Sequence, residues 1–527
     1  MVLRIASFFA ALALLSRPLR AADQPQWGAA WSRNMVSEER GLPESFDPAT
    51  GKNILWVAQL GTETHSTPVV AEGRVLIGTN NEEPRDLRQT GDRGVLMCFD
   101  EQSGRLQWQL VVPKREEDPF FDWPKTGLPS PATVEAGRVY TVDNRGEVLC
   151  LDLHGMVEGN KGPYLDEAAH MTGPPASANP NPVPGAQIAP RLDLPSAGNE
   201  RLVQPSSQDA DILWLFDMVK DAGIWPHDGA HSSILVHGAY LYLNTGTGVD
   251  NTHRAIRTPD APSLIVLEKA TGRLVARDDE HIAPRIFHAT WSSPSVGRWN
   301  GRDVLYFAGG DGVVRAFDLL TESPPAGEVR TLKKVWQYDP DPMAPKENVH
   351  RFTGNKRESP SVIHGMPVFL DGYLYVASGG DLWWGKNEAR IDCVEVLGEN
   401  DATRRGPVWR YPLDRHTMST PAVCDGLVYI ADCGRKLHCL DAATGRQYWE
   451  QELRGEIWAS PLVADGKVYL GTRRGDFWTM AAGKEKKVLS VVEMGKPISG
   501  TATAANGTLY VATMTSLYAI RVGAKSL

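Results

Sequence analysis

A four-part unit recurs along the chain, and this repeat limits the possible folds more than any other feature. Its clearest copy begins at Ser419 and reads STPAVCDGLVYIADCGRKLHCLDAATGRQYWEQEL. Apolar residues alternate with polar ones in it, and turns such as Asp425-Gly426 and Thr444-Gly445 divide the runs. Period-two alternation between Gly-containing turns is typical of antiparallel strands rather than helices. We therefore expect four strands in each unit, the fourth carrying a tryptophan.

Further copies of the unit account for most of the chain. The last copy ends without a fourth strand, whereas the segment NILWVAQL, with Trp56, precedes the first copy and matches the missing strand. A ring closed by strands from both chain ends leaves no sheet edge open. The sequence therefore predicts an all-β fold, an eight-bladed β-propeller of four-stranded antiparallel blades over residues 53–522, closed by the N-terminal strand. The copies lie at or near Ser66, Ser130, Ser232, Ser292, Pro367, Ser419, Ser460 and Gly500.

The high tryptophan count has a structural interpretation in this architecture. The chain contains 16 Trp, and several of them occupy the same place in successive units. A large ring at a fixed place in each fourth strand is expected to pack between neighbouring blades and to bury much apolar area. We assign this role to Trp56, Trp108, Trp214, Trp336, Trp409 and Trp449.

The six cysteines do not predict disulfide bonds. Equivalent places in separate repeats lie too far apart to bridge, because the two Cα atoms must approach within about 7 Å. Cys424 and Cys433 would flank one hairpin, but its register pairs Cys424 with Leu427 and leaves Cys433 far along the partner strand. The other four are expected to be small buried residues of strands, namely Cys98, Cys150, Cys393 and Cys439.

The N-terminus has the pattern of a secretory signal. An apolar run follows Arg4, and Ala21 and Ala22 offer a small-residue cleavage site, so residues 1–21 predict a periplasmic or secreted protein. No later segment has the length of a transmembrane helix. The net charge of -9 argues against non-specific binding to nucleic acid, which needs clustered positive charge.

Four segments depart from the repeat. Residues 22–52 form an N-terminal extension, and residues 523–527 form a tail. A Pro-rich insertion over residues 156–210 falls between the third and fourth strands of the second blade, and its composition favours an irregular excursion, either a lid or a disordered loop. Residues 339–358 form a second, charged excursion.

Polar residues in the loops that enter the first strands are the best candidates for a binding site. The first strand of each propeller blade lines the central channel, so these loops lie at one channel mouth. A cluster of His, Arg, acids and Trp there would suit a polar or anionic ligand, or a metal ion, since His and carboxylates are ordinary ligands. The alternative is a set of hydrogen-bonded loop side chains spread around a wide ring. The candidates are His65, His227, Asp228, His231, Asp250, Asn251, His253, Arg254, Arg285, His288, Trp291, Arg357, Glu358, His364, His416 and Trp458.

The unit resembles the pyrroloquinoline-quinone (PQQ) type of propeller repeat. The resemblance rests on the succession of (S/T)-P, D-G, L-D, T-G and W, and it covers residues 53–522. That superfamily contains quinoprotein alcohol dehydrogenases and the outer-membrane assembly lipoprotein. The resemblance therefore implies either an enzyme that uses PQQ and calcium or a scaffold that binds another protein of the cell envelope.

The quinoprotein pattern differs from this chain at its ligand positions. Where that family has a T-G-N motif whose Asn binds calcium beside PQQ, this chain has Thr245-Gly246-Thr247. A Thr hydroxyl is a poorer calcium ligand than an amide carbonyl. The region that brings the catalytic Asp in the family reads RIFHATWSSP here, and no two cysteines are adjacent. PQQ and calcium are therefore cofactor candidates with an altered ligand at Thr247.

These observations leave alternative functions open. We expect an exported scaffold that binds an envelope protein or a small polar ligand without catalysis, because the repeats are intact and the quinoprotein ligands are changed. The rival is an oxidoreductase that uses PQQ or a metal at the channel-mouth loops. A purely structural module is a third alternative, because no strong catalytic motif occurs and a fold does not define a function.

Overall fold

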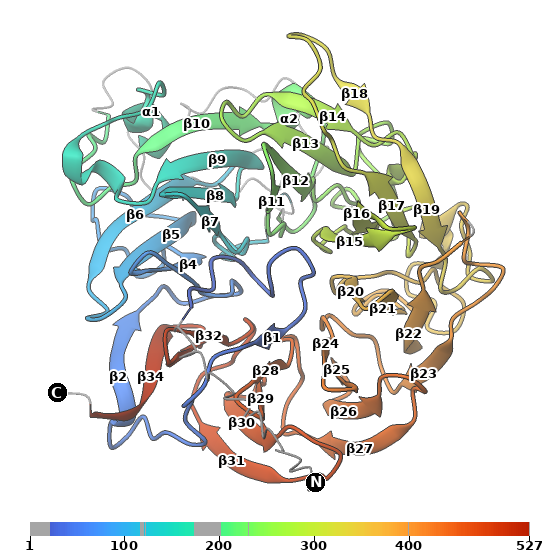
Figure 1. Ribbon diagram of the computed structural model, residues 1–527. Helices are drawn as coiled ribbons and strands as arrows, with labels where there is room; N and C mark the ends of the chain where they lie inside the picture. The colour runs from blue at the N-terminus through green and yellow to red at the C-terminus, as the bar shows by residue number, and fades with distance from the viewer. Residues whose placement is uncertain are drawn as a thin grey trace, which may run out of the picture.

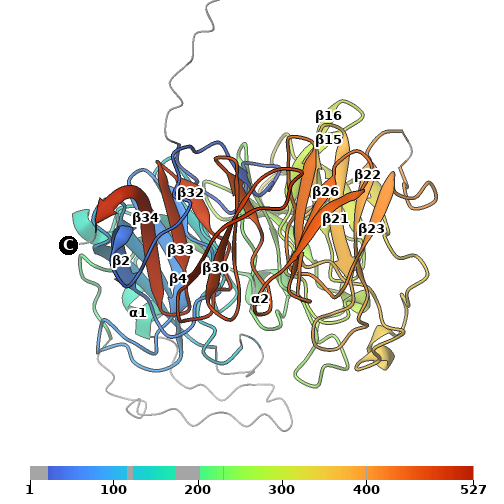
Figure 2. The same ribbon diagram turned by 90° about the horizontal axis from the view of Figure 1, so that it is seen from below.

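Eight separate sheets surround a central axis in this computed structural model, which describes residues 22–115, 121, 123–172, 202–229, 231–398 and 400–525. Each sheet has four antiparallel strands as its body, and the sheets stand side by side around the ring (Figures 1 and 2). The predicted eight-bladed propeller is confirmed within these residues. The first strand of each blade lies nearest the axis in Figure 1, so the loop that enters it opens at one end of the ring.

The first four blades occupy residues 69–338. Blade 1 contains β3 (Val69–Ala71), β4 (Arg74–Asn80), β5 (Arg93–Asp100) and β6 (Leu106–Pro113). Blade 2 contains β7 (Thr133–Glu135), β8 (Arg138–Val142), β9 (Glu147–Asp152) and β10 (Ile212–Asp217). Blade 3 contains β11 (Leu235–His237), β12 (Tyr240–Asn244), β13 (Leu264–Glu268) and β14 (Leu274–Arg277), with β18 (Arg330–Thr331) parallel to β14. Blade 4 contains β15 (Ser295–Trp299), β16 (Arg302–Ala308), β17 (Val314–Asp318) and β19 (Lys334–Tyr338).

The last four blades complete the ring. Blade 5 contains β20 (Val368–Leu370), β21 (Tyr373–Gly379), β22 (Ala389–Glu395) and β23 (Trp409–Leu413). Blade 6 contains β24 (Ala422–Cys424), β25 (Leu427–Asp432), β26 (Lys436–Asp441) and β27 (Gln447–Glu452). Blade 7 contains β28 (Leu462–Ala464), β29 (Lys467–Gly471), β30 (Asp476–Ala481) and β31 (Val488–Glu493), with β1 (Val36–Ser37) parallel to β28. Blade 8 contains β32 (Thr503–Ala505), β33 (Thr508–Ala512), β34 (Ser516–Lys525) and β2 (Lys52–Gln59).

The ring is closed by the two ends of the propeller sequence, as predicted. Strand β2 pairs antiparallel with β34, and Trp56 lies opposite Ala519. The Trp56 ring packs with Phe99 of blade 1 and Tyr510 of blade 8 in one buried cluster. The N-terminal strand therefore completes the last blade as its fourth strand and buries apolar surface against the first blade.

The six predicted blade tryptophans lie in the fourth strands and are buried, as the sequence indicated. Five of them also donate the indole Nε1 hydrogen to a backbone carbonyl of the next blade, as Trp409 does to Ala442 O at 2.9 Å. The Thr-Gly turn of that next blade lies against the ring. Gly445 has φ +69°, and a Cβ there would lie 2.6 Å from Cδ2 of Trp409. The repeated T-G and W are thus two halves of one contact between blades.

The cysteine prediction is also confirmed. All six cysteines are free. Four occupy third strands of different blades, β5, β9, β22 and β26. Cys424 pairs with Leu427 in the hairpin of blade 6, as the turn chemistry predicted.

The N-terminal extension contains a segment that the sequence did not predict, residues 22–37, here called the N-terminal strap. It crosses the middle of the ring in Figure 1. Its carbonyl groups accept backbone hydrogen bonds from innermost strands of several blades: Gln24 O from Val70 N at 2.9 Å and Trp31 O from Val296 N at 2.7 Å. Blades across the ring are therefore tied to one another through the strap.

Arg33 fixes the strap to blades 3 and 4. Its side chain is completely buried, and its guanidinium donates to Pro294 O at 3.1 Å, Trp27 O at 3.0 Å, and to Ser233 Oγ and O at 3.0 and 2.8 Å. No acidic side chain among the described residues forms an ion pair with it. Burial lowers the pKa of Arg33 to about 9. The strap is thus held by hydrogen bonds to neutral oxygens around an unpaired buried cation.

The insertions lie outside the repeating core. Between β9 and β10 the chain forms η1 (Gly155–Glu158) and α1 (Glu167–Thr172), whereas residues 173–201 of the Pro-rich insertion lie outside the described residues, as does the predicted signal at 1–21. Elsewhere the loops contain α2 (Met218–Ala222), η2 (Ala283–Arg285) and η3 (Val349–Phe352). Of the helices in the described part of the chain, none is long and apolar enough to cross a membrane.

Candidate functional site in the central channel

Two kinds of loops meet over the channel. One kind enters the innermost strand of a blade, as in residues 225–234 before β11 and 286–294 before β15. The other joins the second and third strands, as in β12 to β13 and β21 to β22. Both leave the blades at the same end, because each strand reverses the direction of the one before it. Side chains from blades 3, 4 and 5 are thereby brought together although they are distant in sequence.

A cavity of about 110 Å³ lies in the channel beneath these loops, with far more apolar than polar surface. Trp291 and Trp383 meet edge to face at 5.7 Å and 87°, and Trp383 and Trp458 do so at 6.2 Å and 83°. These edge-to-face contacts hold the three tryptophan rings against one another in the lining of the cavity. The lining also includes Trp27, His65, Trp123, Asp228, His231, His364 and Met418.

The N-terminal strap supplies one wall of this cavity. Trp27, which lines the cavity, belongs to the strap, and its carbonyl oxygen accepts a hydrogen bond from Arg33. Opposite parts of the lining come from loops of several blades. The cavity is therefore completed only when the strap is seated across the ring.

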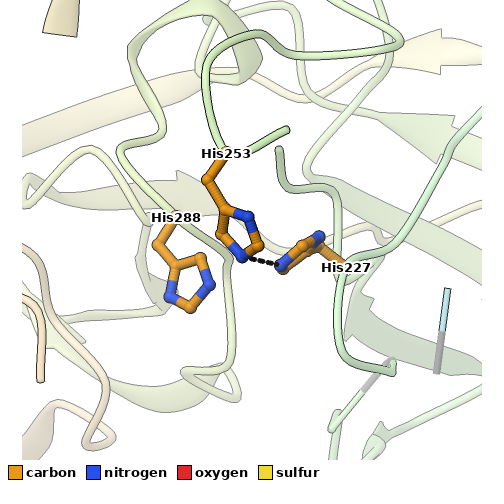
Figure 3. Close-up of side chains that lie close together, drawn as sticks. All are labelled: His227, His253 and His288. Atoms are coloured by element: carbon orange, nitrogen blue, oxygen red, sulfur yellow. Dashed lines mark hydrogen bonds between the residues drawn. The ribbon is translucent and has the colours of Figure 1, made fainter. Parts of the chain in front are cut away.

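Three histidines form a compact cluster beside the cavity, shown in Figure 3. His227 comes from the loop before β11, His253 from the β12–β13 loop and His288 from the loop before β15. One ligand atom of each lies within 4.8 Å of the others, and Nε2 of His227 is 3.2 Å from Nε2 of His253. The Cβ atoms approach from different directions, so the imidazole nitrogens converge on one point.

Two carboxylates flank the cluster. Asp381 accepts a 3.0 Å hydrogen bond from Nδ1 of His288, and its other oxygen accepts from the backbone N–H groups of Trp383 and Trp384. Asp228 lies on the other side, with Oδ2 3.8 Å from Nε2 of His288. Asp381 is completely buried, whereas Asp228 also lines the cavity. The cluster therefore has an inner carboxylate that orients a ring and an outer one that faces the ligand space.

Burial controls the charge of these groups. Burial lowers the pKa of His227 and that of His253, and the neighbouring histidines lower both further, so these rings are neutral near pH 7. Burial acts on His288 in the same direction, but the charge of Asp381 outweighs it and raises the pKa of His288. Burial also lowers the pKa of His231 to about 4. The site is thus rich in neutral imidazoles.

Most of the sequence-predicted site residues converge. His65 stacks with Trp458 at 5.9 Å on the cavity wall, and His364 lies 5.0 Å from Trp291, ring centroid to centroid. Together with the three clustered histidines and Asp228, the converging set includes His65, His231, Trp291, His364 and Trp458. The structure therefore brings these nine predicted residues close together at one end of the channel.

The remaining predicted residues are not among those that line the cavity. Asp250 caps its own turn, accepting from Thr252 Oγ1 at 2.6 Å. Arg285 pairs with Asp311 at 3.3 Å. Loop positions that point into solvent look the same in sequence as positions that point into the channel. The residues outside the cavity are Asp250, Asn251, Arg254, Arg285, Arg357, Glu358 and His416.

Sequence reasoning missed Asp381, Trp383, Trp384 and Trp27. The first three lie in the β21–β22 loop, in the stretch GGDLWWG, at a place where blades 2, 4, 6, 7 and 8 have a short turn. Two adjacent tryptophans outside the fourth-strand position were the available signal. Trp27 had no such signal, because the strap has no counterpart in any repeat.

Two further groups of metal-type side chains lie elsewhere. His416, Cys433 and Glu456 offer one ligand atom each within 4.8 Å, and Cys433 donates to Ile457 O at 3.2 Å. The group Asp143, Glu147 and His170 contains a 2.9 Å ion pair between His170 and Glu147.

The residues at the quinoprotein calcium position do not fit that cofactor arrangement. Thr247 is completely buried, and its hydroxyl lies 2.8 Å from Thr245 Oγ1 and donates to Pro262 O. Its side chain is therefore engaged within its own loop rather than directed at a ligand. The cavity, at about 110 Å³, is also well below the roughly 300 Å³ expected of a pocket for a larger ligand such as a tricyclic quinone.

Comparisons with known proteins agree with the repeat. Residues 395–523 match the profile of a family described as "Outer membrane protein assembly factor BamB". A relative of the same description from Nitrosomonas eutropha is 27% identical over 93 residues, which is 17% of this chain and only 23% of the relative's length. The prediction of a PQQ-like propeller repeat, similar to that of the assembly lipoprotein, is confirmed.

Two solved structures are similar over nearly the whole ring. BamB from Moraxella catarrhalis has a TM-score of 0.50 and 11% identity, covering 90% of this chain and 98% of that one. A europium-containing methanol dehydrogenase has a TM-score of 0.52 and 13% identity, covering 93% and 89%. The first is described as an assembly factor and the second as a dehydrogenase, so the shared fold does not decide between a binding and a catalytic function. The decision rests on the side chains of the channel.

Proposed function

We propose that this protein is an exported propeller that binds a small, flat and mainly apolar molecule in its central channel. The observation that carries the proposal is the cavity walled by perpendicular tryptophan rings and completed by the N-terminal strap. Aromatic walls with a few convergent polar groups are typical of small-molecule sites. Asp228 and His65 are the polar groups that would orient the ligand. The ligand is thus less polar than the sequence indicated.

The envelope location is part of this proposal. It is supported by the signal-like residues 1–21 and by the similarity to an outer-membrane assembly factor. A protein-binding scaffold is the second candidate, because residues 395–523, which carry the family match, include β23 of blade 5 and most of blades 6 to 8, on the side of the ring away from the histidine cluster. A propeller can bind a protein through such outer surfaces while its channel holds a small molecule.

The ligand proposal can be tested with two small aromatic probes, benzoate and benzamide, which share a flat ring and differ in charge. We expect saturable quenching of tryptophan fluorescence by at least one of them. Trp383→Ala should weaken that binding at least about tenfold, since loss of an aromatic wall removes about 1.5 kcal/mol or more of contact. Trp31→Ala is the matched control, because Trp31 is exposed and does not line the cavity. Unsaturable quenching, or equal weakening in both variants, would contradict the proposal.

The oxidoreductase alternative has its own test. Purified protein would be incubated with PQQ and calcium, and dye-linked oxidation of alcohols and sugars would be measured. We expect no turnover, because Thr247 is engaged within its loop. Turnover that is abolished by a substitution in the channel would instead favour the enzyme.

A further inference from the structure

We propose that His227, His253 and His288, with Asp228, form a binding site for one divalent transition-metal ion of the zinc type. The inference stands on side chains beside the cavity, and it does not depend on the proposed small-molecule ligand. The three rings belong to different loops of blades 3 and 4, so their convergence is a tertiary feature rather than a consequence of local sequence (Figure 3).

The spacing of the nitrogens matches a tetrahedral site. Zinc binds imidazole nitrogen at about 2.0–2.1 Å, which places two such nitrogens about 3.3 Å apart in a tetrahedron. The Nε2 atoms of His227 and His253 lie 3.2 Å apart, and the ligand atoms of all three histidines lie within 4.8 Å of one another. Small side-chain rotations would therefore bring the third nitrogen to the same distance.

His288 is held in the orientation that a metal ligand requires. Its Nδ1 donates to Asp381 at 3.0 Å, which turns Nε2 toward the cluster and Asp228. The ring is 2% exposed, and Nε2 is buried without a hydrogen-bond partner. An unsatisfied buried nitrogen costs about 1–3 kcal/mol, so its presence needs an explanation. A carboxylate bound to the far nitrogen of a ligand histidine is the usual second layer of a metal site.

Asp228 provides the fourth ligand. Its Oδ2 lies 3.5 Å from Nε2 of His227 and 3.8 Å from Nε2 of His288, on the cavity side of the cluster. Three imidazoles and one carboxylate suit zinc, copper, nickel or cobalt, whereas calcium and magnesium prefer oxygen ligands. The ion would thus sit in the wall of the cavity.

The decisive experiment is binding of Zn²⁺ and Co²⁺ to purified, chelator-treated protein. Titration calorimetry should give one Zn²⁺ per chain, and Co²⁺ should give the intense visible absorption of a tetrahedral ion without the near-ultraviolet band of a thiolate ligand. The titrations would be run on the unmodified protein and on Cys433→Ser, which removes the sulfur ligand of the other histidine group. Loss of the bound Zn²⁺ in Cys433→Ser would assign the ion to that other group and overturn the proposal.

Two variants distinguish metal binding from folding. His253→Ala should weaken Zn²⁺ binding at least about 100-fold, more than the 10–100-fold typical of losing a supporting partner. His350→Ala is the matched control: it removes a nearby half-buried imidazole that is bonded only to Ile286 O, and Zn²⁺ affinity should not change. Thermal unfolding of the metal-free proteins would show that both variants fold. Unchanged Zn²⁺ affinity in His253→Ala, or equal loss in both variants, would refute the site.

Asp381→Asn tests the positioning residue. The amide has one acceptor oxygen where the carboxylate has two, so Asn cannot accept from Nδ1 of His288 and from the backbone N–H groups of the loop together, and the negative charge is lost. We expect a 10–100-fold weaker Zn²⁺ affinity with the tetrahedral Co²⁺ spectrum retained at saturation. A changed spectrum would mean that Asp381 maintains the conformation of its loop rather than the basicity of the His288 ring. An unchanged Zn²⁺ affinity would remove Asp381 from the proposal.

Discussion

Replacing Arg33 tests how the N-terminal strap is held across the ring. The guanidinium makes four hydrogen bonds to neutral oxygens and has no acidic partner among the described residues. Two substitutions separate the hydrogen bonds from the charge. Arg33→Met keeps the length and much of the apolar contact of the side chain but removes all donors. Arg33→Lys keeps the charge but replaces the planar fork by a more strongly hydrated ammonium.

The two contributions nearly offset each other in the wild-type protein. Hydrogen bonds from a charged donor contribute about 1.5–3 kcal/mol each, so four of them give roughly 6–12 kcal/mol. Burying a cation without a counter-ion costs several kcal/mol. We therefore expect Arg33→Met to lower the free energy of unfolding by about 2–4 kcal/mol. Arg33→Lys should be at least about 1 kcal/mol worse than Arg33→Met, because it keeps the cost of burial and loses part of the bonding.

Two measurements check this expectation. Urea unfolding followed by tryptophan fluorescence gives the order of stabilities, wild type above Arg33→Met above Arg33→Lys. Amide hydrogen exchange locates the change, because Val70 and Val296 donate backbone hydrogen bonds to the strap. These amides should lose protection in both variants before the rest of the blades opens.

Two results would refute the reasoning. If Arg33→Lys were as stable as wild type, the fork geometry would not matter, and if it were more stable than Arg33→Met, the unpaired burial of the charge would not be costly. If the amides of Val70 and Val296 kept their protection, the strap would be held by contacts other than Arg33. In the second case the cavity wall at Trp27 would also be independent of this side chain.

Further predictions concern the pH dependence of stability and the packing of the blades. Burial opposes a charge on His170, but its bonds to Asp143 and Glu147 outweigh this and raise the pKa of His170 to about 9. The charged His170 therefore stabilises the folded protein fully below about pH 6.5, and this stabilisation is lost as the pH rises through 9. His170→Gln should therefore remove on the order of 3 kcal/mol of stability at pH 6 and almost none at pH 10, which urea unfolding at the two pH values would show. Gly445→Ala should destabilise by about 1–3 kcal/mol in thermal unfolding, because its Cβ would meet the Trp409 ring at 2.6 Å and its φ is +69°.

The repeat made the blades predictable and the strap unpredictable for the same reason. The four-stranded unit recurs from blade to blade, so a weak strand signal in one copy is supported by the other copies. Even the missing strand around Trp56 could be identified in this way. The strap occurs once and has almost no strand of its own beyond Val36–Ser37. Its conformation depends on hydrogen bonds to distant blades, such as Arg33 to Pro294. Such long-range partners leave no local pattern.

The candidate site was predictable at the level of loops rather than side chains. The rule that loops entering the innermost strands share one rim selected His227, His288 and Trp291, which the structure places near one another, because topology alone places those loops. It gave no information on side-chain direction, so Arg357 was selected as readily as His364. Asp381 was not predicted, because candidates from loops between second and third strands came only from blade 3.

A single site in a ring of similar blades requires that some blades differ from the others in their loops. In this propeller blades 3, 4 and 5 differ, and their extended loops bring His253 and Asp381 over the channel. Blades 6 to 8 keep short, regular turns and supply mainly walls such as Trp458. Both proposed sites therefore lie where loops depart from the repeat, and substitutions in those loops should change binding more than they change the stability of the ring.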